Sequence, residues 1–121
     1  MSDCYFCNPH NNIFEENGFF IHEDEYPVSP GHYEVVPKRH ITSFFDLNPD
    51  ELLSLYNIIK KTKQLVEKRH KPDGYNIGIN EGKAAGRSVH HLHIHVIPRY
   101  KGDVKNPQGG IRNVIPEKGD Y

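Results

Sequence analysis

The segment that decides the fold reads HLHIHVI, residues 91–97, and it alternates polar with apolar side chains. Alternation with a period of two is typical of a β-strand that has one face in the core of the protein. On such a strand the apolar side chains point inward, while His91, His93 and His95 project from the other face about 6.6–6.8 Å apart. The segment therefore predicts a strand over residues 89–97 that carries three imidazoles on one surface.

Shorter segments on the N-terminal side of this strand also favour extended structure. Turn-forming residues, such as Gly18 and the segment PVSPG at residues 27–31, separate runs that are rich in β-branched and aromatic side chains. A meander, in which consecutive strands pair, is the simplest arrangement of the runs in the first half of the chain, at residues 13–16, 19–23 and 32–37. Together, all of these runs predict further strands at residues 13–16, 19–23, 32–37 and 75–80.

One long amphipathic helix is expected to begin near Pro49. Asn48 supplies an N-cap side chain, proline stands at the first helical position, and Glu51 stands three residues after the cap, which is the pattern of a capping box. The segment KRHKP, residues 68–72, should end the helix, because cations favour the negative end of the helix dipole and proline breaks the helix. Apolar residues recur between these ends near helical spacing, at Leu52, Leu55, Tyr56, Ile59 and Val66.

These elements predict an α+β fold, with an antiparallel sheet of about five strands and the long helix packed across it. The chain fits a single domain, residues 1–121, in which residues 101–121 form an irregular tail. The apolar runs are too short to span a bilayer, and the N-terminus lacks a secretory signal pattern, so we expect a cytoplasmic protein with no membrane role. A formal net charge of -1 favours a small phosphorylated ligand over a long nucleic acid.

The histidine run admits two kinds of chemistry. Neutral imidazoles at alternate strand positions can chelate one zinc or copper ion. The preceding loop, NEGKAAGRS at residues 80–88, favours an anion instead, because its glycines can turn backbone amides toward a phosphate while Arg87 adds a cation and Ser88 a hydroxyl group. Together, the loop and the histidines favour a phosphate-binding site at the start of this strand.

Cys4 and Cys7 form a Cys-x-x-Cys pair near the N-terminus. In a cytosolic protein this spacing indicates zinc or redox chemistry more than a structural disulfide. Two reduced thiols with no ligand are the alternative interpretation.

Taken together, these segments resemble the histidine-triad (HIT) nucleotide-binding superfamily, whose signature is three alternating histidines followed by apolar residues, as at residues 91–97. The tail, residues 102–116, is similar to that of microbial members related to the dinucleoside polyphosphate hydrolases. The resemblance implies a homodimer that binds a nucleotide or dinucleotide. It continues in family order through PVSPGH at 27–32, VVPKRH at 35–40, NEG at 80–82 and PR at 98–99.

The resemblance implies a nucleotide-phosphate hydrolase or transferase that acts at the α-phosphate of dinucleoside polyphosphates or nucleoside phosphoramidates. His93 would attack the phosphorus and form a nucleotidyl-histidine intermediate, which divides one displacement into two. His95 would orient the nucleophile or stabilise charge, and Ser88 would donate to the leaving oxygen. Asn80 would hold the phosphate oxygens. Water and inorganic phosphate both remain open as acceptors.

Three further residues are assigned to nucleotide binding by the same resemblance. Asp24 matches the position that binds ribose hydroxyls, and His32 matches a histidine that lies near the triad. Arg87 departs from the family pattern, because many members carry glutamine there, and its charge leaves the substrate preference open.

Zinc-containing members of the family imply the ligands that the cysteine pair lacks. His40 and His91 would complete a closed Cys₂His₂ site with Cys4 and Cys7, holding one structural zinc ion per chain. Two other functions stay open, a nucleotide-binding module without turnover and a metalloenzyme with its metal on the histidine triad. The sequence assigns no role to His10, His22, His70 and His90.

Overall fold

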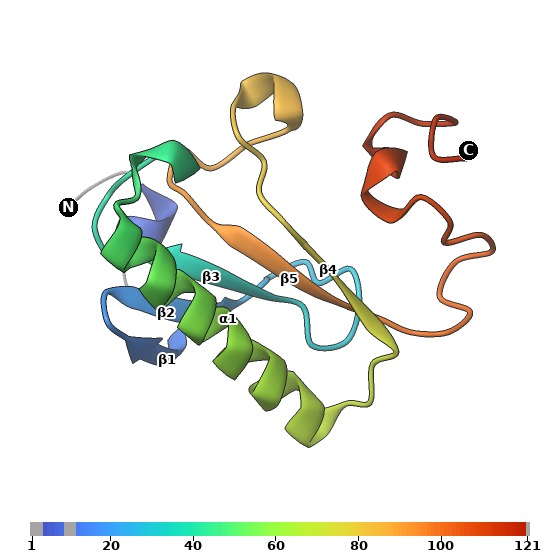
Figure 1. Ribbon diagram of the computed structural model, residues 1–121, viewed down its shortest axis with the longest axis horizontal. Coiled ribbons are helices and arrows are strands. Elements are labelled where there is room, and N and C mark those ends of the chain that lie inside the picture. Colours follow the sequence, from blue (N-terminus) through green and yellow to red (C-terminus); the bar gives the residue numbers. More distant parts are fainter. Residues whose placement is uncertain (1–3, 9–11, 121) are drawn as a thin grey trace.

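The computed structural model describes residues 4–8 and 12–120. The strands form one sheet in the order β1-β2-β3-β5-β4, and each neighbouring pair is antiparallel. The α+β fold predicted from the sequence, an antiparallel five-stranded sheet with one long helix, is confirmed (Figure 1). The strands are β1 (Asn12–Glu16), β2 (Phe19–Glu23), β3 (Tyr33–Pro37), β4 (Gly74–Gly78) and β5 (Ile94–Arg99).

Consecutive strands pair in a meander only in the first half of the sheet. β1, β2 and β3 follow one another, whereas β5 lies between β3 and β4. The chain reaches β4 through the helix α1 (Pro49–Arg69), which crosses one face of the sheet and delivers β4 to the far edge (Figure 1). The chain then returns antiparallel to β4, which places β5 beside β3 in the interior of the sheet.

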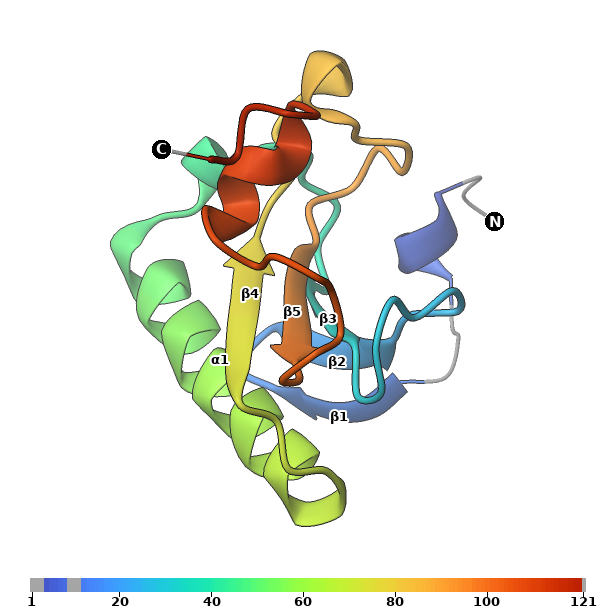
Figure 2. The same ribbon diagram turned by 90° about the vertical axis from the view of Figure 1, so that its right-hand side faces the viewer.

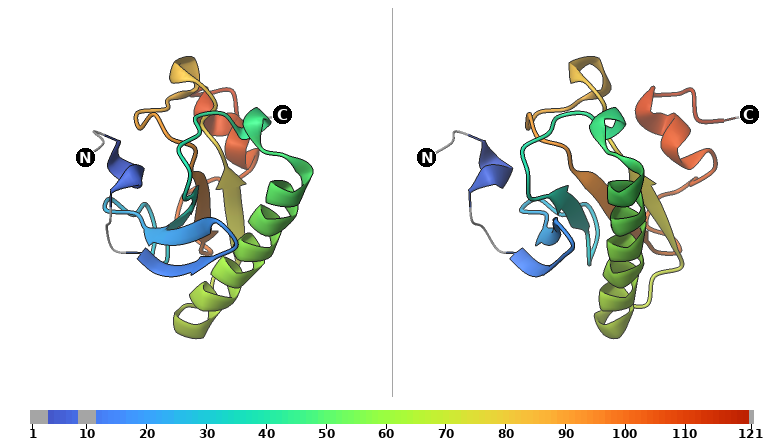
Figure 3. Two further views of the ribbon diagram at one scale, coloured as in Figure 1. Left: turned by 90° about the vertical axis from the view of Figure 1, so that its left-hand side faces the viewer. Right: turned by 60° about the vertical axis from the view of Figure 1, so that its left-hand side comes forward.

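The two faces of the sheet bury different side chains. Phe20 and Val36 pack with Phe6, which comes from the N-terminal 3-10 helix η1 (Tyr5–Cys7). Figures 2 and 3 show α1 and η1 on opposite sides of the sheet. The face toward η1 is therefore the one that α1 leaves open. On the other face α1 packs against the strands in a cluster that includes Ile21, Val35, Leu55, Ile58, Val66, Ile94 and Val96.

The predicted N-terminal boundary of the triad strand is wrong. β5 begins at Ile94 rather than at residue 89, so the first two triad histidines precede it. The carbonyl oxygen of Pro37, at the end of β3, accepts a hydrogen bond from His91 Nε2 at 2.8 Å. The Leu92 N–H donates to the carbonyl oxygen of Ile41 at 2.7 Å. The hydrogen-bond ladder between β3 and β5 stops here, because these contacts occupy the Pro37 carbonyl and the Leu92 amide, which would otherwise extend it.

Two smaller boundary predictions are also corrected. β4 ends at Gly78, the partner of His95, so Asn80 lies in the following loop rather than on the strand. The strand ends here because its partner β5 has nearly reached its own first residue. β3 begins at Tyr33, and His32 lies just before it.

The predicted start of α1 is confirmed, together with its capping box. The Glu51 N–H donates to Asn48 Oδ1 at 2.8 Å, and the Asn48 N–H donates to Glu51 Oε1 at 3.0 Å. Pro49 occupies the first turn, and the helix ends at Arg69. These bonds satisfy two backbone donors at an end where the helix provides no partners.

The remaining connections contain short helical turns. Within the described ranges, no helix combines the length and the apolar character that a membrane span requires. The segment after β5 carries the last of these turns, and Figure 2 shows it beside β4. The turns are the 3-10 helices η2 (Phe44–Asp46), η3 (Lys83–Ala85) and η4 (Gly110–Val114).

Asn48→Ala should lower the free energy of unfolding by about 1 kcal/mol, because it removes the side-chain acceptor at the start of α1. In thermal unfolding this corresponds to a fall of about 3–6 °C in melting temperature. The matched control is Asn57→Ala, the same change at an exposed position inside α1. The control should keep or slightly raise stability, since alanine is the better helix former. Equal losses in both variants would contradict the contribution of the cap.

Candidate active site and metal centre

A cavity of about 340 Å³ lies on the face of the sheet toward η1. Strands β2, β3 and β5 provide its floor, and η1 and the loop before β5 provide its walls. The cavity brings together Asp24, Asn80, Ser88, His93 and His95, which were selected from the sequence. Its other lining residues are Tyr5, Phe6, His22, Glu25, Tyr26, Glu34 and Val89.

A hydrogen bond to the backbone defines the tautomer of the His93 ring. Its Nδ1 lies 2.8 Å from the carbonyl oxygen of His91, and Nδ1 must carry the proton because a carbonyl can only accept. Burial lowers the pKa of His93, which favours the neutral ring. The lone pair therefore resides on Nε2, which faces the cavity 3.9 Å from Glu34 Oε2.

His32 and His95 are hydrogen-bonded to each other, and this bond defines their tautomers. Gly31, with a φ of +86°, makes the turn before His32. The Val28 N–H donates to His32 Nδ1 at 3.2 Å, so the proton of His32 is on Nε2, which donates to His95 Nδ1 at 3.0 Å. Burial, aided by the neighbouring His93 and His32, lowers the pKa of His95 to about 4. His95 is therefore neutral and carries its proton on Nε2.

Asp24 lies at the edge of the same cavity, beside this pair. Its Oδ1 accepts a hydrogen bond from the Tyr26 N–H at 2.8 Å. Its Oδ2 lies 3.4 Å from His32 Nε2 and 3.9 Å from His95 Nδ1. The carboxylate is half-buried and oriented by its own turn, so it can accept further hydrogen bonds from a ligand.

Three backbone amides of the loop over residues 80–88 are not available for the predicted phosphate cradle. The amides of residues 85–87 donate to carbonyl oxygens within the loop itself, so they do not face an anion. The Arg87 guanidinium donates to the carbonyl oxygen of Thr42 at 2.9 Å and does not line the cavity. Only the two ends of the loop reach the cavity, each with a polar side chain.

Sequence reasoning did not select several residues of this cavity. Phe6 forms a wall, with its ring centroid 5.1 Å from that of His93. Glu34 is buried beside His93, and His22, which was assigned no role, is buried opposite Glu34 in the β2–β3 register. The available signal was the charge of Glu34 inside the otherwise apolar segment at residues 33–36. His10, which was also assigned no role, lies outside the described residues.

A second cavity, of about 600 Å³, adjoins the first and shares Asn80 and His95 with it. It extends the site to the other side of His95, toward β4 and the C-terminal segment. Its walls are more apolar and include Ile77, Ile79, Ile97, Ile111, Val114 and Ile115.

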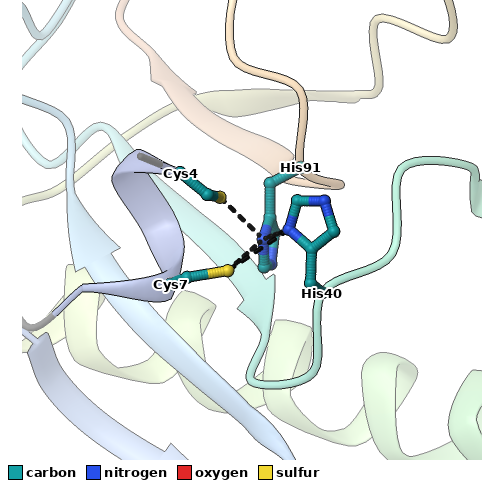
Figure 4. A group of neighbouring side chains, drawn as sticks. All are labelled: Cys4, Cys7, His40 and His91. Atoms are coloured by element: carbon teal, nitrogen blue, oxygen red, sulfur yellow. Dashed lines mark hydrogen bonds between the residues drawn. The ribbon is translucent and has the colours of Figure 1, made fainter. Parts of the chain in front are cut away.

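Cys4, Cys7, His40 and His91 lie together (Figure 4). The His91 ring centroid is 5.8 Å from that of Phe6, which lines the first cavity. Cys4 Sγ is 3.3 Å from His91 Nδ1, and Cys7 Sγ is 3.2 Å from His40 Nδ1. The two Nδ1 atoms are 3.2 Å apart. The ligand atoms of a tetrahedral zinc ion stand about 3.3–3.8 Å apart, given Zn–N and Zn–S bonds of about 2.0 and 2.3 Å. The spacing of this cluster therefore fits zinc.

His91 also has the tautomer that a zinc ligand needs. Its Nε2–H donates to the carbonyl oxygen of Pro37 at 2.8 Å, which leaves the lone pair on Nδ1, the atom that faces Cys4 and His40. A metal-bound histidine commonly donates its second ring N–H to a carbonyl in this way. Two thiols and two imidazoles are enough to close a tetrahedral site without a water ligand.

The three triad histidines do not share one surface, contrary to the prediction. The His91 ring packs against His40 with centroids 5.0 Å apart, whereas the rings of His93 and His95 lie 5.2 Å apart in the cavity. In the described parts of the chain, no candidate metal-binding group combines His91 with His93 or His95. Strand alternation does not apply to His91, because β5 begins only at Ile94. One metal ion on all three histidines does not fit this arrangement.

The His95 ring should stay neutral in the folded protein until the pH falls to about 4. An unfolded histidine titrates near 6.5, so the unfolded chain binds this proton first and His95 contributes stability that is lost as the pH falls from about 6.5 toward 4. The pKa of Glu34 is raised to about 8, so its contribution to stability has the opposite pH dependence. This contribution is lost as the pH rises through about 8.

Titration of the His95 ring by nuclear magnetic resonance isolates this residue from the opposing effect of Glu34. The same signal in urea, where the chain is unfolded, is the control and should titrate near 6.5. A midpoint close to the urea value in the folded protein would contradict the burial of His95.

The sequence matches a known protein family. Residues 6–102 match the HIT domain. A HIT-like protein from Methanocaldococcus jannaschii is 37% identical over 118 residues, which cover 92% of this chain and 91% of that protein. A bis(5'-nucleosyl)-tetraphosphatase (asymmetrical) from Schizosaccharomyces pombe is 43% identical over 77 residues, which cover 64% of this chain and 42% of that protein.

The fold also matches solved structures. A zinc-bound histidine triad family protein from Mycobacterium smegmatis superposes with a TM-score of 0.75 at 32% identity, covering 86% of this chain and 80% of that one. The relatives thus include a nucleotide hydrolase and a zinc-bound protein of the same fold. The domain match covers most of the chain, and the chain belongs to the HIT family.

Proposed function

We propose that the protein is a nucleotide-phosphate hydrolase or transferase in which His93 attacks the α-phosphorus. The proposal rests above all on the state of His93, a neutral ring whose Nδ1 proton is held by a carbonyl and whose Nε2 lone pair faces the cavity. A neutral imidazole is a competent nucleophile near neutral pH. The relative from Schizosaccharomyces pombe, named as a tetraphosphatase, supports the same reaction class.

In the first step His93 Nε2 bonds to phosphorus and the leaving group departs. In the second step water, or inorganic phosphate, displaces the nucleotide from His93. The neutral His95 presents its Nε2–H as a donor to phosphate oxygens, and His32 fixes it in that tautomer. Asn80 and Ser88 supply further donors from the two ends of their loop. Asp24 accepts hydrogen bonds from the ribose hydroxyls.

Dinucleoside polyphosphates and nucleoside phosphoramidates are the proposed substrates. The two adjoining cavities, which share His95, offer space on both sides of the proposed reaction centre. Arg87 contributes through its charge, which favours the neutral form of His93, rather than by lining the cavity. We also propose a homodimer, for which the exposed side chains of Leu53 and Tyr56 offer apolar surface to a second copy.

His93→Ala should reduce kcat by at least about 10³-fold, because the covalent step needs the imidazole. Nucleotide affinity, which comes from the ribose and phosphate contacts, should change much less. His90→Ala is the matched control, because it makes the same change at an exposed neighbour. Assays with diadenosine tetraphosphate and adenosine phosphoramidate, each with and without phosphate, measure turnover and identify the acceptor.

The intermediate provides an independent test. An alkaline-quenched sample taken during turnover should show a nucleotidyl adduct on His93 in the mass spectrum. Near-normal turnover by His93→Ala, or an adduct on another residue, would disprove the proposed nucleophile. Tight nucleotide binding by the wild type without any turnover would favour a binding module.

We propose that Cys4, Cys7, His40 and His91 bind one structural zinc ion per chain. The spacing of the cluster, the tautomer of His91 and the zinc-bound structural relative support this assignment. The ion would tie η1 to the segment that leads into β5, and so hold the cavity wall in place. It would take no direct part in the reaction, since all four coordination positions are filled by the protein.

Protein purified without added metal should contain one zinc ion per chain by elemental analysis. His40→Ala should lose most of the zinc and lower the melting temperature, because a three-ligand site binds zinc more weakly and η1 is released. His90→Ala should retain both zinc and stability. If the purified wild-type protein contains no metal, and added zinc does not change its melting temperature, the proposed structural role of zinc is wrong.

A further inference from the structure

A buried carboxyl group lies in the cavity floor and has no part in the steps above. Glu34 pairs with His22 across β2 and β3 and with His95 across β3 and β5, so the three side chains form a row over three strands. Only 6% of Glu34 is exposed, and its carboxyl lines the cavity. A carboxyl group at such an interior strand position costs free energy, so its placement needs a reason.

Three imidazole nitrogens surround this carboxyl group without bonding to it. Oε2 lies 3.9 Å from His93 Nε2 and 4.0 Å from His95 Nδ1, and Oε1 lies 4.0 Å from His22 Nε2. These distances exceed a direct hydrogen bond. Over the residues that the structure describes, no hydrogen bond engages the carboxyl group of Glu34. It is therefore available to a substrate atom or to a water molecule beside His93.

The surroundings keep Glu34 protonated at neutral pH. Burial, together with the negative charges of Asp24 and Glu25, raises the pKa of Glu34 to about 8. No lysine or arginine is among the described residues that line this cavity, so a protonated Glu34 also removes a charge that would repel a phosphate. The ionisable groups that face Glu34 are Tyr5 from η1, His22 from β2, Asp24 and Glu25 from the following turn, and His93 and His95.

The neighbouring imidazoles cannot easily supply a proton to a leaving group. His93 keeps its Nδ1–H on the carbonyl of His91 and uses Nε2 for the attack. His95 and His32 are neutral rings, because burial lowers the pKa of each. A neutral imidazole donates hydrogen bonds but is a very weak acid. Glu34 is thus the protonated acid nearest to the nucleophile.

We propose that Glu34 is the general acid and base of the reaction, which gives its proton to the leaving group and later takes one from the incoming water. This inference rests on the proposed function of His93. In the first step the bond from Nε2 to phosphorus forms, the bond from phosphorus to the leaving atom breaks, and the proton of Glu34 joins that leaving atom. In the second step water bonds to phosphorus and gives a proton to the Glu34 carboxylate, and the electron pair of the broken N–P bond returns to Nε2.

Two substrates with different leaving groups test this role. The p-nitrophenyl ester of AMP releases a stable anion that needs no proton, whereas an N-alkyl phosphoramidate of adenosine releases an amine that must be protonated. In single-turnover assays Glu34→Gln should slow the phosphoramidate by about 10²–10⁴-fold and the ester by less than about threefold. Glu23→Gln makes the same change at an exposed position on β2 and should slow neither substrate.

If Glu34→Gln slows both substrates equally, Glu34 only positions the substrate and the proposal is overturned. If the variant slows neither substrate, the proposal is also overturned. Zinc content and melting temperature establish that the variant is folded. If it is not, the wild type offers a second measurement, in which the phosphoramidate-to-ester rate ratio should fall as the pH rises through about 8. A constant ratio would overturn the proposal. Absence of a nucleotidyl adduct in the wild type would instead mean that the proposed function itself fails.

Discussion

The contacts of His91 hold the whole site together. Its Nε2–H donates to the carbonyl of Pro37 at the end of β3, and its Nδ1 faces the thiol of Cys4. Its own carbonyl oxygen accepts the Nδ1–H of His93 and thereby fixes the tautomer of the proposed nucleophile. His91 is completely buried, so water cannot replace these bonds if they break. One residue thus connects the cysteine–histidine cluster, the sheet and the proposed reaction centre.

The site forms where the ladder between β3 and β5 stops. The bond from His91 to Pro37 uses a carbonyl that would otherwise continue the pairing of these strands. Beyond this point the chain is free to direct His91 toward the cysteines while His93 stays in the cavity. The cysteine–histidine cluster and the cavity therefore lie side by side, with η1 contributing Cys7 to one and Phe6 to the other.

Burial has opposite effects on the two kinds of ionisable group in the cavity. It lowers the pKa of His93 and His95 and raises that of Glu34, so all three are uncharged near neutral pH. No lysine or arginine lines the cavity among the described residues. Such a site would bind a phosphate through neutral hydrogen-bond donors rather than through cations.

The sequence by itself determined the features that depend on neighbouring residues. Strand β2, the start of α1 at Pro49 and its capping box agree with the sequence prediction, because turn residues and cap residues act locally. The alternating histidines and the segments around them were sufficient to identify the family, and that resemblance selected His93, His95 and Asp24. The paired cysteines likewise indicated zinc or redox chemistry.

The family resemblance already implied that the triad divides between a zinc cluster and a catalytic pair, and only the tertiary structure gave the physical reason for this division. His91 leaves the row of His93 and His95 because its ring bonds to Pro37, which is 54 positions away, and strand alternation contains no information about such a contact. In the sequence Glu34 is a single charge in an apolar strand. The register of three strands places Glu34 between His22 and His95, and burial raises its pKa. Its position and its protonation state therefore depend on packing that the local sequence cannot specify.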